Sequence, residues 1–366
     1  MANSILTPTA VTRKIQQVLH GKLVLAKKVN RQYDDSFAQS GGKIGTDLKI
    51  RLPNKYTVRT GKTLVAQDTS ESSVTLTVAT QVGVDMTFST AELTMSMEDF
   101  SERIIEPAAA IVATNIENAI AARFIDVANV VGTAGTTPAS MLTVLQAGAR
   151  MDDFLVPRDG KRVVALSPLA MATMVDAYKG LFQKSGSISN QYESGMVEDM
   201  ASGFKWGMCP VINPQVNSAG VVTSITVNGV VVDGDSTVTV STTTTAYSAG
   251  TVVTFAGCYA VNDETKTAYS FLRQFVVTSA TATVLTISPT IRTTGANQNC
   301  SAIPTNGGAV VVLGAASGSY PQHLAFHRDW LALATADLED VSKFGAWGAR
   351  EVYDGISIRL ARQYDI

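Results

Sequence analysis

The chain has 366 residues, a length at which two or three domains are expected in place of one compact core. Only 16% of the residues are charged, well below the usual share of about 25%, which favours a protein that covers much of its surface by self-association. The formal net charge of -2 argues against a sequence-specific nucleic-acid-binding protein, because such proteins normally carry a basic surface.

The cysteines and the N-terminus indicate an intracellular protein. Cys209, Cys258 and Cys300 have no CxxC spacing and are odd in number, so we expect free buried thiols and folding in a reducing compartment. Residues 1–8 lack the basic-then-apolar layout of a signal peptide. No run approaches the ~18 consecutive apolar residues of a membrane span. The sequence therefore predicts a protein made and kept in the cytoplasm, without a membrane partner.

The first 90 residues predict a helix and then an extended arm. Thr7 and Pro8 supply an N-cap and a first helical position, and apolar residues follow at helical spacing as far as Gly21. Lys43–Arg59 is typical of an extended arm, and the polar loop Thr60–Ser73 follows it. Strand-like alternation then covers Val74, Leu76 and Val78, and again Val82, Val84, Met86 and Phe88. A two-stranded projection has no core of its own, so its own domain or a neighbouring subunit must support it.

The longest helix is expected from Pro107 to about Val130, a rod of roughly 35 Å at ~1.5 Å per residue. Its predicted apolar stripe consists of Ile111, Val112, Ile116, Ala119, Ile120, Phe124 and Val127. The polar residues Asn115, Glu117, Asn118, Arg123 and Asp126 are expected on the remaining surface.

Two shorter helices are predicted by a Thr-Pro or Ser-Pro start. One begins at Thr137-Pro138 and continues through Met141, Leu142 and Leu145. The other begins at Ser167-Pro168, directly after the apolar strand Arg162–Leu166. A strand that feeds directly into a capped helix is typical of α/β structure.

The composition changes at about Pro214, and from there to Gly308 valine, threonine, serine and glycine dominate. Strand-like runs cover Val221–Val232, Val238–Ser241, Thr251–Tyr259, Phe271–Val277 and Ala282–Ile287, with turn residues such as Asn228-Gly229 between or within them. This pattern predicts a small antiparallel β-barrel or sandwich. Framework patterns resume after it, so it is expected to be an insertion.

The C-terminal part ends in two β-like segments. His323–Leu338 contains an apolar run that is broken by the polar turn at 327–329. Gly355–Ile366 alternates strictly, as a half-buried strand does. Arg359 and Arg362 then fall on opposite faces, so they do not form one phosphate-binding patch.

No motif predicts catalysis, a metal site or a cofactor. His323 and His327 lack the glutamate of an HExxH motif and a third ligand, so a strand end and a turn are expected there. The Thr60–Thr63 stretch lacks the opening glycine of a P-loop, because residue 56 is Tyr56, and is expected to be a solvated basic loop. Asp233–Asp235 lacks the other ligands of an EF-hand and is expected to be a β-turn. A GxSxG elbow is also absent, so we expect a protein that is not an enzyme.

Taken in order, these elements resemble the coat proteins of short-tailed phages of the P-22 type, a branch of the HK-97-like major capsid fold. The resemblance covers nearly the full length, and its most specific stretches are His323–Leu338, Gly355–Ile366 and Tyr247–Gly257. It implies an α+β protein with an N-arm, an extended loop, a spine helix, a peripheral domain and an axial domain, together with an inserted all-β domain.

The resemblance also implies a division of the chain. The expected parts are an N-terminal arm (1–40), an extended loop with peripheral-domain strands (41–90), a spine helix region (91–132), a first part of the axial domain (133–213), an inserted β-barrel-like domain (214–308), and a return to the axial domain with closing peripheral-domain strands (309–366).

Two sets of charged residues are candidates for contacts between subunits. In the family the extended loop of one subunit lies across the spine helix and peripheral domain of the next. The candidate inter-subunit contacts are Arg51, Lys55, Arg59, Lys62, Asp68, Glu71, Glu98, Asp99 and Glu102. A charged loop of the inserted domain would reach a neighbouring capsomer, and its candidates are Asp233, Asp235, Asp263, Glu264 and Lys266. The basic residues of the first set, Arg51, Lys55, Arg59 and Lys62, together with Lys27 and Lys28, could instead contact phosphate. Ion pairs between subunits are favoured, because the acidic residues from Asp68 to Glu106 form a set of comparable size.

The function implied is that of a major capsid protein that self-assembles into the icosahedral head of a tailed double-stranded DNA bacteriophage and encloses its genome. The implied partners are other copies in hexamers and pentamers, a scaffolding protein, a portal protein at one vertex, and packaged DNA by non-specific contact only; a decoration protein is left open. Assembly would take place in the host cell cytoplasm, without removal of an N-terminal segment. The alternatives are an encapsulin-like cellular nanocompartment shell, a β-rich surface adhesin, and an uncharacterised hydrolase.

Overall fold

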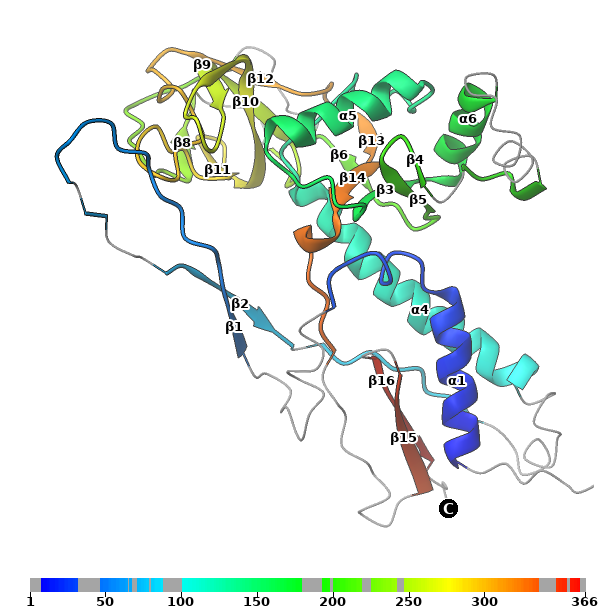
Figure 1. Cartoon of the computed structure of the whole chain (residues 1–366). Helices are drawn as coiled ribbons and strands as arrows, with labels where there is room; N and C mark the ends of the chain where they lie inside the picture. The colour runs from blue at the N-terminus through cyan, green and yellow to red at the C-terminus, as the bar shows by residue number, and fades with distance from the viewer. Residues whose placement is uncertain are drawn as a thin grey trace, which may run out of the picture. The chain divides into compact units, whose positions relative to one another are not determined.

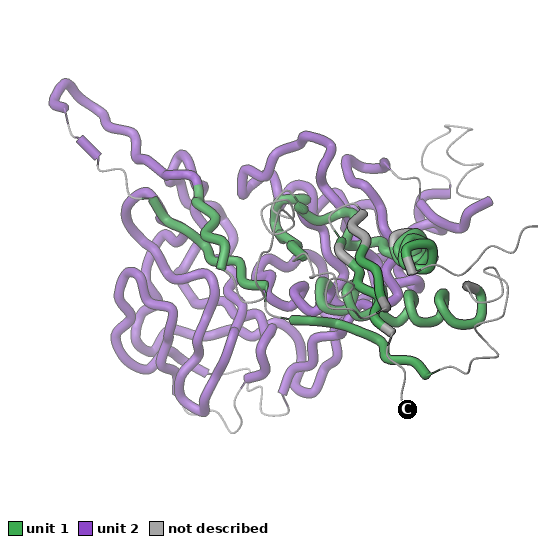
Figure 2. The backbone as a smooth tube through the Cα atoms, turned by 90° about the horizontal axis from the view of Figure 1, so that it is seen from below, with its two compact units in different colours: residues 1–52, 71–120, 328–366 green, residues 53–70, 121–327 purple. Residues whose placement is uncertain are grey.

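The structure is a computed structural model that describes residues 8–31, 47–64, 66–67, 71–78, 80–87, 101–179, 193–197, 200–218, 225–241, 247–335, 347–353 and 356–362. The chain divides into two compact units (Figure 2). Unit 1 comprises residues 1–52, 71–120 and 328–366, and unit 2 comprises residues 53–70 and 121–327. Helices and β-sheets both occur, which confirms the predicted α+β class (Figure 1).

Unit 1 combines helices with two-stranded sheets. Its elements are α1 (Pro8–Lys22), β1 (Asp47–Arg51), β2 (Ser73–Thr77), the π-helical turn η2 (Ser101–Ile105), α4 (Glu106–Ala121), the short 3-10 turn η4 (Arg328–Trp330), β15 (Trp347–Tyr353) and β16 (Ile356–Arg362). The boundary between the units follows Ile120, so the last residue of α4 belongs to unit 2. The first predicted helix and the closing strand are therefore confirmed. The residue proposed as the N-cap of the first helix, Thr7, lies outside the described residues.

Helix α1 packs against the antiparallel β15–β16 hairpin. Val11 of α1 and Ile105 are both buried, and Ile15 and Leu360 pack against them. The side chain of Gln16 is 3% exposed and donates from Nε2 to the carbonyl oxygen of Ile356 at 2.7 Å. The beginning and the end of the sequence thus share one small core, as the alternation of the closing strand requires.

The predicted long helix exists, but its boundaries and its buried face differ from the prediction. The α-helix begins at Glu106, becomes a 3-10 turn (η3, Ala122–Asp126) and gives way to extended backbone at Val127, three residues before the predicted end. The buried residues are Ile105, Ala109, Ala113, Glu117, Ile120, Ala121 and Phe124. Of the predicted stripe, Ile111 is 60% exposed and Ala119 is also exposed. The buried face runs through Ala109, Ala113, Glu117 and Ala121 at a spacing of four, and Ile105, Ile120 and Phe124 extend it.

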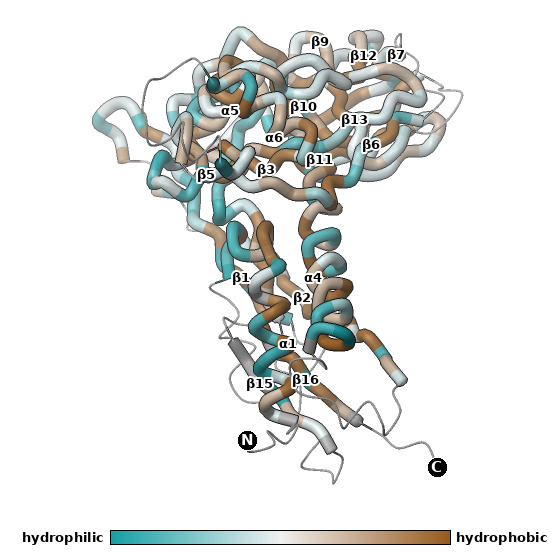
Figure 3. The backbone as a smooth tube through the Cα atoms, turned by 90° about the vertical axis from the view of Figure 1, so that its right-hand side faces the viewer, coloured by the Kyte–Doolittle hydropathy of each residue, from teal (hydrophilic) through white to brown (hydrophobic). Residues whose placement is uncertain are grey.

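The stretch Glu102–Asp126 is, among the described residues, the one helical segment long and apolar enough to cross a membrane. It carries hydrophobic and hydrophilic segments along its length (Figure 3). Glu117, near its middle, is 6% exposed and accepts hydrogen bonds from three backbone amides of residues 24–26. A buried carboxylate whose partners belong to the same unit is typical of a core helix of a globular unit.

A four-stranded sheet with two helices forms one part of unit 2. The strand order is β14 (Leu324–His327), β3 (Arg162–Leu166), β5 (Phe204–Met208) and β4 (Met200–Ala201). All five residues of β3 are buried, and β3 runs parallel to β5 and antiparallel to β14. Helices α5 (Met141–Asp153) and α6 (Pro168–Tyr178) bury Val144, Met171 and Met174 against it. The short strands β6 (Pro214–Val216) and β13 (Ser319–Pro321) pair separately.

One of the two Ser/Thr-Pro helix starts is correct. Ser167 is the N-cap of α6, and its hydroxyl accepts from the amide of Ala170, with Pro168 following it. The predicted start at Thr137-Pro138 is wrong, because α5 begins three residues later, where Ser140 caps the amide of Leu142. The carbonyl of Pro138 instead accepts from the hydroxyl of Thr173 on α6 at 2.8 Å, which holds this segment outside the helix.

Six antiparallel strands of unit 2 form the sheet predicted from the β-rich composition. In sheet order they are β7 (Ile225–Thr226), β12 (Ala309–Val312), β9 (Val252–Val261), β10 (Ala268–Ala280), β11 (Val284–Ser288) and β8 (Thr237–Thr239). Its two edges meet, since Val227 bridges Val240 and the amide of Asn228 donates to the carbonyl of Thr239 at 2.9 Å. The sheet therefore closes into a small barrel, and closure leaves no long unpaired edge.

The barrel has its own hydrophobic core. Phe255 and Phe275 are fully buried and their ring centroids lie 5.5 Å apart. Cys258 and Cys300 are buried in the same core, and Cys209 is buried elsewhere, all three as free thiols, as predicted. The predicted run Val221–Val232 is a strand only at β7 within its described part, while β12 adds a strand beyond residue 308.

Candidate assembly surfaces

The extended arm is a hairpin with little burial of its own. Strands β1 and β2 pair antiparallel, with Leu48 opposite Leu76 and Ile50 opposite Val74. Most of their residues are exposed, and the predicted strand at Val74 and Leu76 is confirmed, although it ends before Val78. The second alternating run is not a strand over its described residues, 82–87, and Phe88 lies outside the described part of the chain. Alternation alone predicted a strand there, but no partner strand pairs with these residues.

The residues of the arm expose large apolar side chains. The exposed ones in the described parts of this segment are Leu52, Tyr56, Val58, Leu64, Val74, Val82 and Met86. Val58 is 89% exposed and Leu64 is 82% exposed. A stretch that presents so much apolar surface to water is typical of a segment that docks on another surface.

The charged candidates of the arm have partners within the chain or face solvent. Arg51 pairs with Glu71 at 3.1 Å, and both side chains are more than half exposed. The guanidinium of Arg59 donates to the carbonyls of Gly61 and Thr63, and the Thr60–Thr63 loop is exposed, as predicted for a solvated basic loop. Lys62 and Glu102 are also exposed. Asp68, Glu98 and Asp99 lie outside the described residues.

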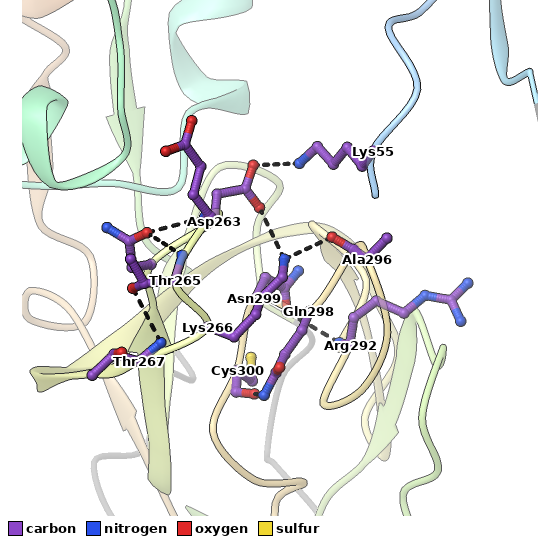
Figure 4. Close-up of polar contacts among 12 residues, drawn as sticks. Lys55, Asp263, Thr265, Lys266, Thr267, Arg292, Ala296, Gln298, Asn299 and Cys300 are labelled. Atoms are coloured by element: carbon purple, nitrogen blue, oxygen red, sulfur yellow. Dashed lines mark hydrogen bonds and ion pairs between the residues drawn. The ribbon is translucent and has the colours of Figure 1, made fainter. Parts of the chain in front are cut away.

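Lys55 joins the two predicted sets of contact residues. Its Nζ forms an ion pair with the carboxylate of Asp263 (Figure 4), although the sequence places Lys55 in the arm set and Asp263 in the barrel set. Both residues belong to unit 2, and their side chains are 47% and 38% exposed. The structure thus pairs one candidate of each set within a single chain.

The turn between β9 and β10 is shaped by Asn262. Its Oδ1 accepts from the amides of Glu264 and Thr265 at 3.0 and 2.9 Å, and Lys266 adopts a positive φ of 57°. The Nζ of Lys266 donates to the carbonyl of Ala296 at 2.7 Å and lies 3.9 Å from Asp263. Glu264 is exposed. Of this turn's three charged side chains, two are therefore held by neighbouring residues and one faces solvent.

Both carboxylates of the turn Asp233–Asp235 accept hydrogen bonds from backbone amides. Asp233 accepts from the amide and the hydroxyl of Thr293, and Arg292 lies 3.8 Å away. The backbone hydrogen bond from Thr293 is the main reason why the pKa of Asp233 is lowered. Asp235 accepts from the amide of Val232 at 2.8 Å. The predicted β-turn with two carboxylates is confirmed; Asp235 accepts within the turn, and Asp233 joins the turn to residues 292–294.

The two histidines of the C-terminal segment serve the four-stranded sheet. His323 directly precedes β14 and His327 ends it, in agreement with the predicted strand end and turn. Nδ1 of His323 accepts a hydrogen bond from the amide of Ser167 at 3.4 Å, and Nε2 of His327 lies 3.0 Å from Oδ1 of Asp159. Burial lowers the pKa of His323. Within the described residues no group of three or more His, Cys, Asp or Glu side chains could hold a metal ion.

Glu117 is a structurally important residue, although the sequence pattern predicts a position on the polar face of the long helix. Its carboxylate accepts from the amides of Val24, Leu25 and Ala26 at 2.9, 2.8 and 3.1 Å. It thereby ties the turn after α1 to the long helix within unit 1. The available signal was its position four residues after Ala113, in phase with the small residues of the buried face.

Comparison with known protein families gives a match over the full length of the chain. A family described as "P22 coat protein - gene protein 5" matches residues 1–366. A structure from Mycobacterium phage Che8 is similar with a TM-score of 0.41 at 18% identity, covering 51% of this chain and 68% of that one. A structure entitled "CUS-3 coat protein I-domain" has a TM-score of 0.20 at 27% identity, covering 26% of this chain and 98% of that one. No curated protein matches the chain.

Proposed function

The chain belongs to the P22 coat protein family and is a phage major capsid protein, and from this premise we propose how its subunits join. The family is one of structural proteins, so the chain self-assembles into a capsid and is found in the virion. In the proposal the arm of each subunit docks on a neighbouring subunit within a ring of copies. The capsid is the icosahedral head of a tailed double-stranded DNA phage.

The exposed apolar side chains of the arm carry this proposal. A two-stranded hairpin without a core is marginally stable in water, so its apolar surface has to be covered by something. Full burial of one Val or Leu side chain stabilises a contact by roughly 1.5–3 kcal/mol. Val58 and Leu64, which are more than four-fifths exposed, are the strongest contributors. A neighbouring copy is the natural cover in a protein that self-assembles.

The charged residues are proposed as secondary contacts. We assign Arg51, Lys55, Arg59, Lys62, Asp68, Glu71, Glu98, Asp99 and Glu102 to the docked arm and the surface that receives it, and Asp233, Asp235, Asp263, Glu264 and Lys266 to contacts between capsomers. Of the second set, Glu264 is the residue best placed to contact a neighbouring capsomer, because its side chain is exposed while Asp263 and Lys266 already have partners within the chain.

We further propose the fold of the whole chain and its partners. The chain has the HK-97-like major capsid fold with an inserted all-β domain, and the closed barrel with its own core supports the latter. A scaffolding protein, a portal protein and non-specifically bound DNA are the proposed partners, with assembly in the host cytoplasm and no enzymatic activity.

The test compares assembly of two matched variants. Val58→Glu together with Leu64→Glu places charge on the arm, whereas Val311→Glu places it on the outer surface of the barrel, where Val311 is 55% exposed. Full-length protein co-expressed with its genomic neighbours is examined by negative-stain microscopy and sedimentation. We expect shells from the wild type and from Val311→Glu, and folded, unassembled subunits from the arm variant. Normal shells from the arm variant would refute arm docking.

A further inference from the structure

A pocket of about 440 Å³ opens beside the turn that holds Asp263. It lies entirely within unit 2, and its charged lining residues are Lys55, Asp263, Arg273 and Arg292. Asn297, Asn299 and Thr290 contribute polar groups, and Phe154 contributes an aromatic face. Three cations and one carboxylate give the lining an excess of positive charge.

Arg273 of β10 is a partly buried cation whose Nε has no hydrogen-bond partner among the described residues. Its Nε–H is fully buried and donates to no acceptor among the described residues, and no described carboxylate forms an ion pair with its guanidinium. The guanidinium carbon lies 4.7 Å from the centroid of the Phe154 ring, which packs on it as an aromatic face. Burial lowers the pKa of Arg273, while the nearby Cys300, Cys258 and Asp263 oppose this shift and the like charge of Arg150 adds to it. Burying a guanidinium without hydrogen bonds is costly, so such a group normally has a counter-ion.

A second arginine strengthens the positive field at this place. The guanidinium of Arg150, on α5, lies 3.6 Å from the centroid of Phe271, and burial lowers its pKa as well. Phe271 is stacked on Tyr269 at 5.1 Å, and the Tyr269 hydroxyl donates to the carbonyl of Asp153 at 2.6 Å. The aromatic cluster therefore fixes both guanidinium groups in position without neutralising either of them.

The acidic groups nearby are committed to other cations. The carboxylate of Asp263 is held by Lys55, and Lys266 lies 3.9 Å away on its other side (Figure 4). Arg292 lies beside Asp233, at 3.8 Å. No described carboxylate is thus within ion-pair distance of Arg273, although Asp263 lines the same pocket.

We propose that this pocket is an oxyanion-binding site in which Arg273 is the principal ligand and Lys55 the second. A guanidinium presents a planar fork of donors that fits a carboxylate or a phosphate. Lys55 can turn from Asp263 to the anion at little cost, because their ion pair is exposed and such pairs contribute little. The ligand is either a free small anion or a carboxylate side chain of a second copy of this chain. The site itself does not depend on the proposed arm docking.

The test titrates full-length unassembled protein with inorganic phosphate and with citrate, against chloride at equal ionic strength, by calorimetry and by urea unfolding. At ten times its dissociation constant the anion raises the folding equilibrium constant roughly tenfold. Arg273→Met, which keeps the length of the side chain, abolishes this gain and does not destabilise the protein in chloride. The control Lys62→Gln removes an exposed cation that lies on the same arm as Lys55 but outside the pocket. In this variant the anion should still raise the folding equilibrium constant roughly tenfold.

Two further measurements separate the sources of the anion. If citrate or phosphate slows assembly of the wild type but not of Arg273→Met, the natural ligand is a carboxylate of a second copy; if assembly is unaffected while binding is saturable, it is a free anion. The proposal is overturned by the absence of saturable binding, by equal binding to Arg273→Met, or by binding of a DNA duplex alone. It is also overturned if Arg273→Met destabilises the protein in chloride, since Arg273 would then serve only its ring contact.

Discussion

Replacing Glu117 tests the idea that a buried carboxylate fastens the turn after α1 to the long helix. Its two carboxylate oxygens accept from three consecutive backbone amides, of Val24, Leu25 and Ala26, at 2.8 to 3.1 Å. The side chain lies in a part of unit 1 where Leu25 and Ala26 are fully buried. In Glu117→Ala these amides lose their acceptor, and a helix of small residues cannot supply another.

The expected size of the effect follows from the number of donors left without a partner. A hydrogen bond to a charged group contributes about 1.5–3 kcal/mol, but water reaching the cavity compensates part of the loss. Each buried amide left without an acceptor costs about 1–3 kcal/mol, so three amides, partly reached by water, give a loss of about 3–5 kcal/mol. We expect this range for Glu117→Ala. Glu117→Gln keeps one acceptor oxygen but turns an NH2 group towards the amides, so about half of the loss is expected.

Urea unfolding of the unassembled full-length protein measures the free energy of unfolding, with the slope of the transition as a check on two-state behaviour. Glu102→Ala, at an exposed position of the preceding helical turn, is the matched control and should stay within about 0.5 kcal/mol of the wild type. A loss below about 1 kcal/mol for Glu117→Ala would refute the reasoning. It would mean that the three amides find water or other acceptors at no cost.

Two further predictions concern unit 2. Ser140→Ala should cost about 1 kcal/mol by removing the cap of α5, whereas Thr137→Ala at the wrongly predicted start should have no measurable effect in the same unfolding assay. Asp152 accepts from Arg158 and from the buried Arg162, and the hydrogen bond from Arg158 is the main cause that holds its pKa well below the ordinary value. A lowered folded-state pKa stabilises the protein above the unfolded value, about 3.9 for aspartate, and this contribution is lost as the pH falls. The stability difference between wild type and Asp152→Asn should therefore be largest near neutral pH and shrink below about pH 4; a pH-independent difference would contradict the ion-pair explanation.

Local sequence signals predicted the elements whose stabilising contacts lie close in the chain. The hydroxyl of Ser167 caps α6, and the ring of Pro168 suits its first helical position. The alternation of the β-rich region predicted a barrel because each strand buries one face in a common core. The α5 start failed because Thr137-Pro138 and Ser140 are equally good caps locally. The hydrogen bond of the Pro138 carbonyl to Thr173, more than 30 residues away, removes the first of them from the helix.

The buried face of the long helix and the anion pocket could not be predicted for the same reason. Hydrophobicity favours Ile111 as a core residue, but the buried face runs through Ala109, Ala113 and Glu117, whose carboxylate meets free amides. Arg273 and Arg150 carry no local signal of burial, because arginines in a strand or a helix ordinarily face solvent. Their positions over Phe154 and Phe271 depend on the packing of elements far apart in sequence.

The pairing of Lys55 with Asp263 bears on how an arm can exchange its contacts during assembly. An exposed ion pair contributes about 0–1 kcal/mol, and the same holds for Arg51 with Glu71. Exchanging such a pair for an equivalent one on a neighbouring copy therefore changes the free energy very little. Burying Val58 or Leu64 contributes roughly 1.5–3 kcal/mol each, several times more. The apolar side chains should consequently set the strength of arm docking, while the charged residues select its register, and raising the salt concentration should alter the rate of assembly more than the stability of finished shells.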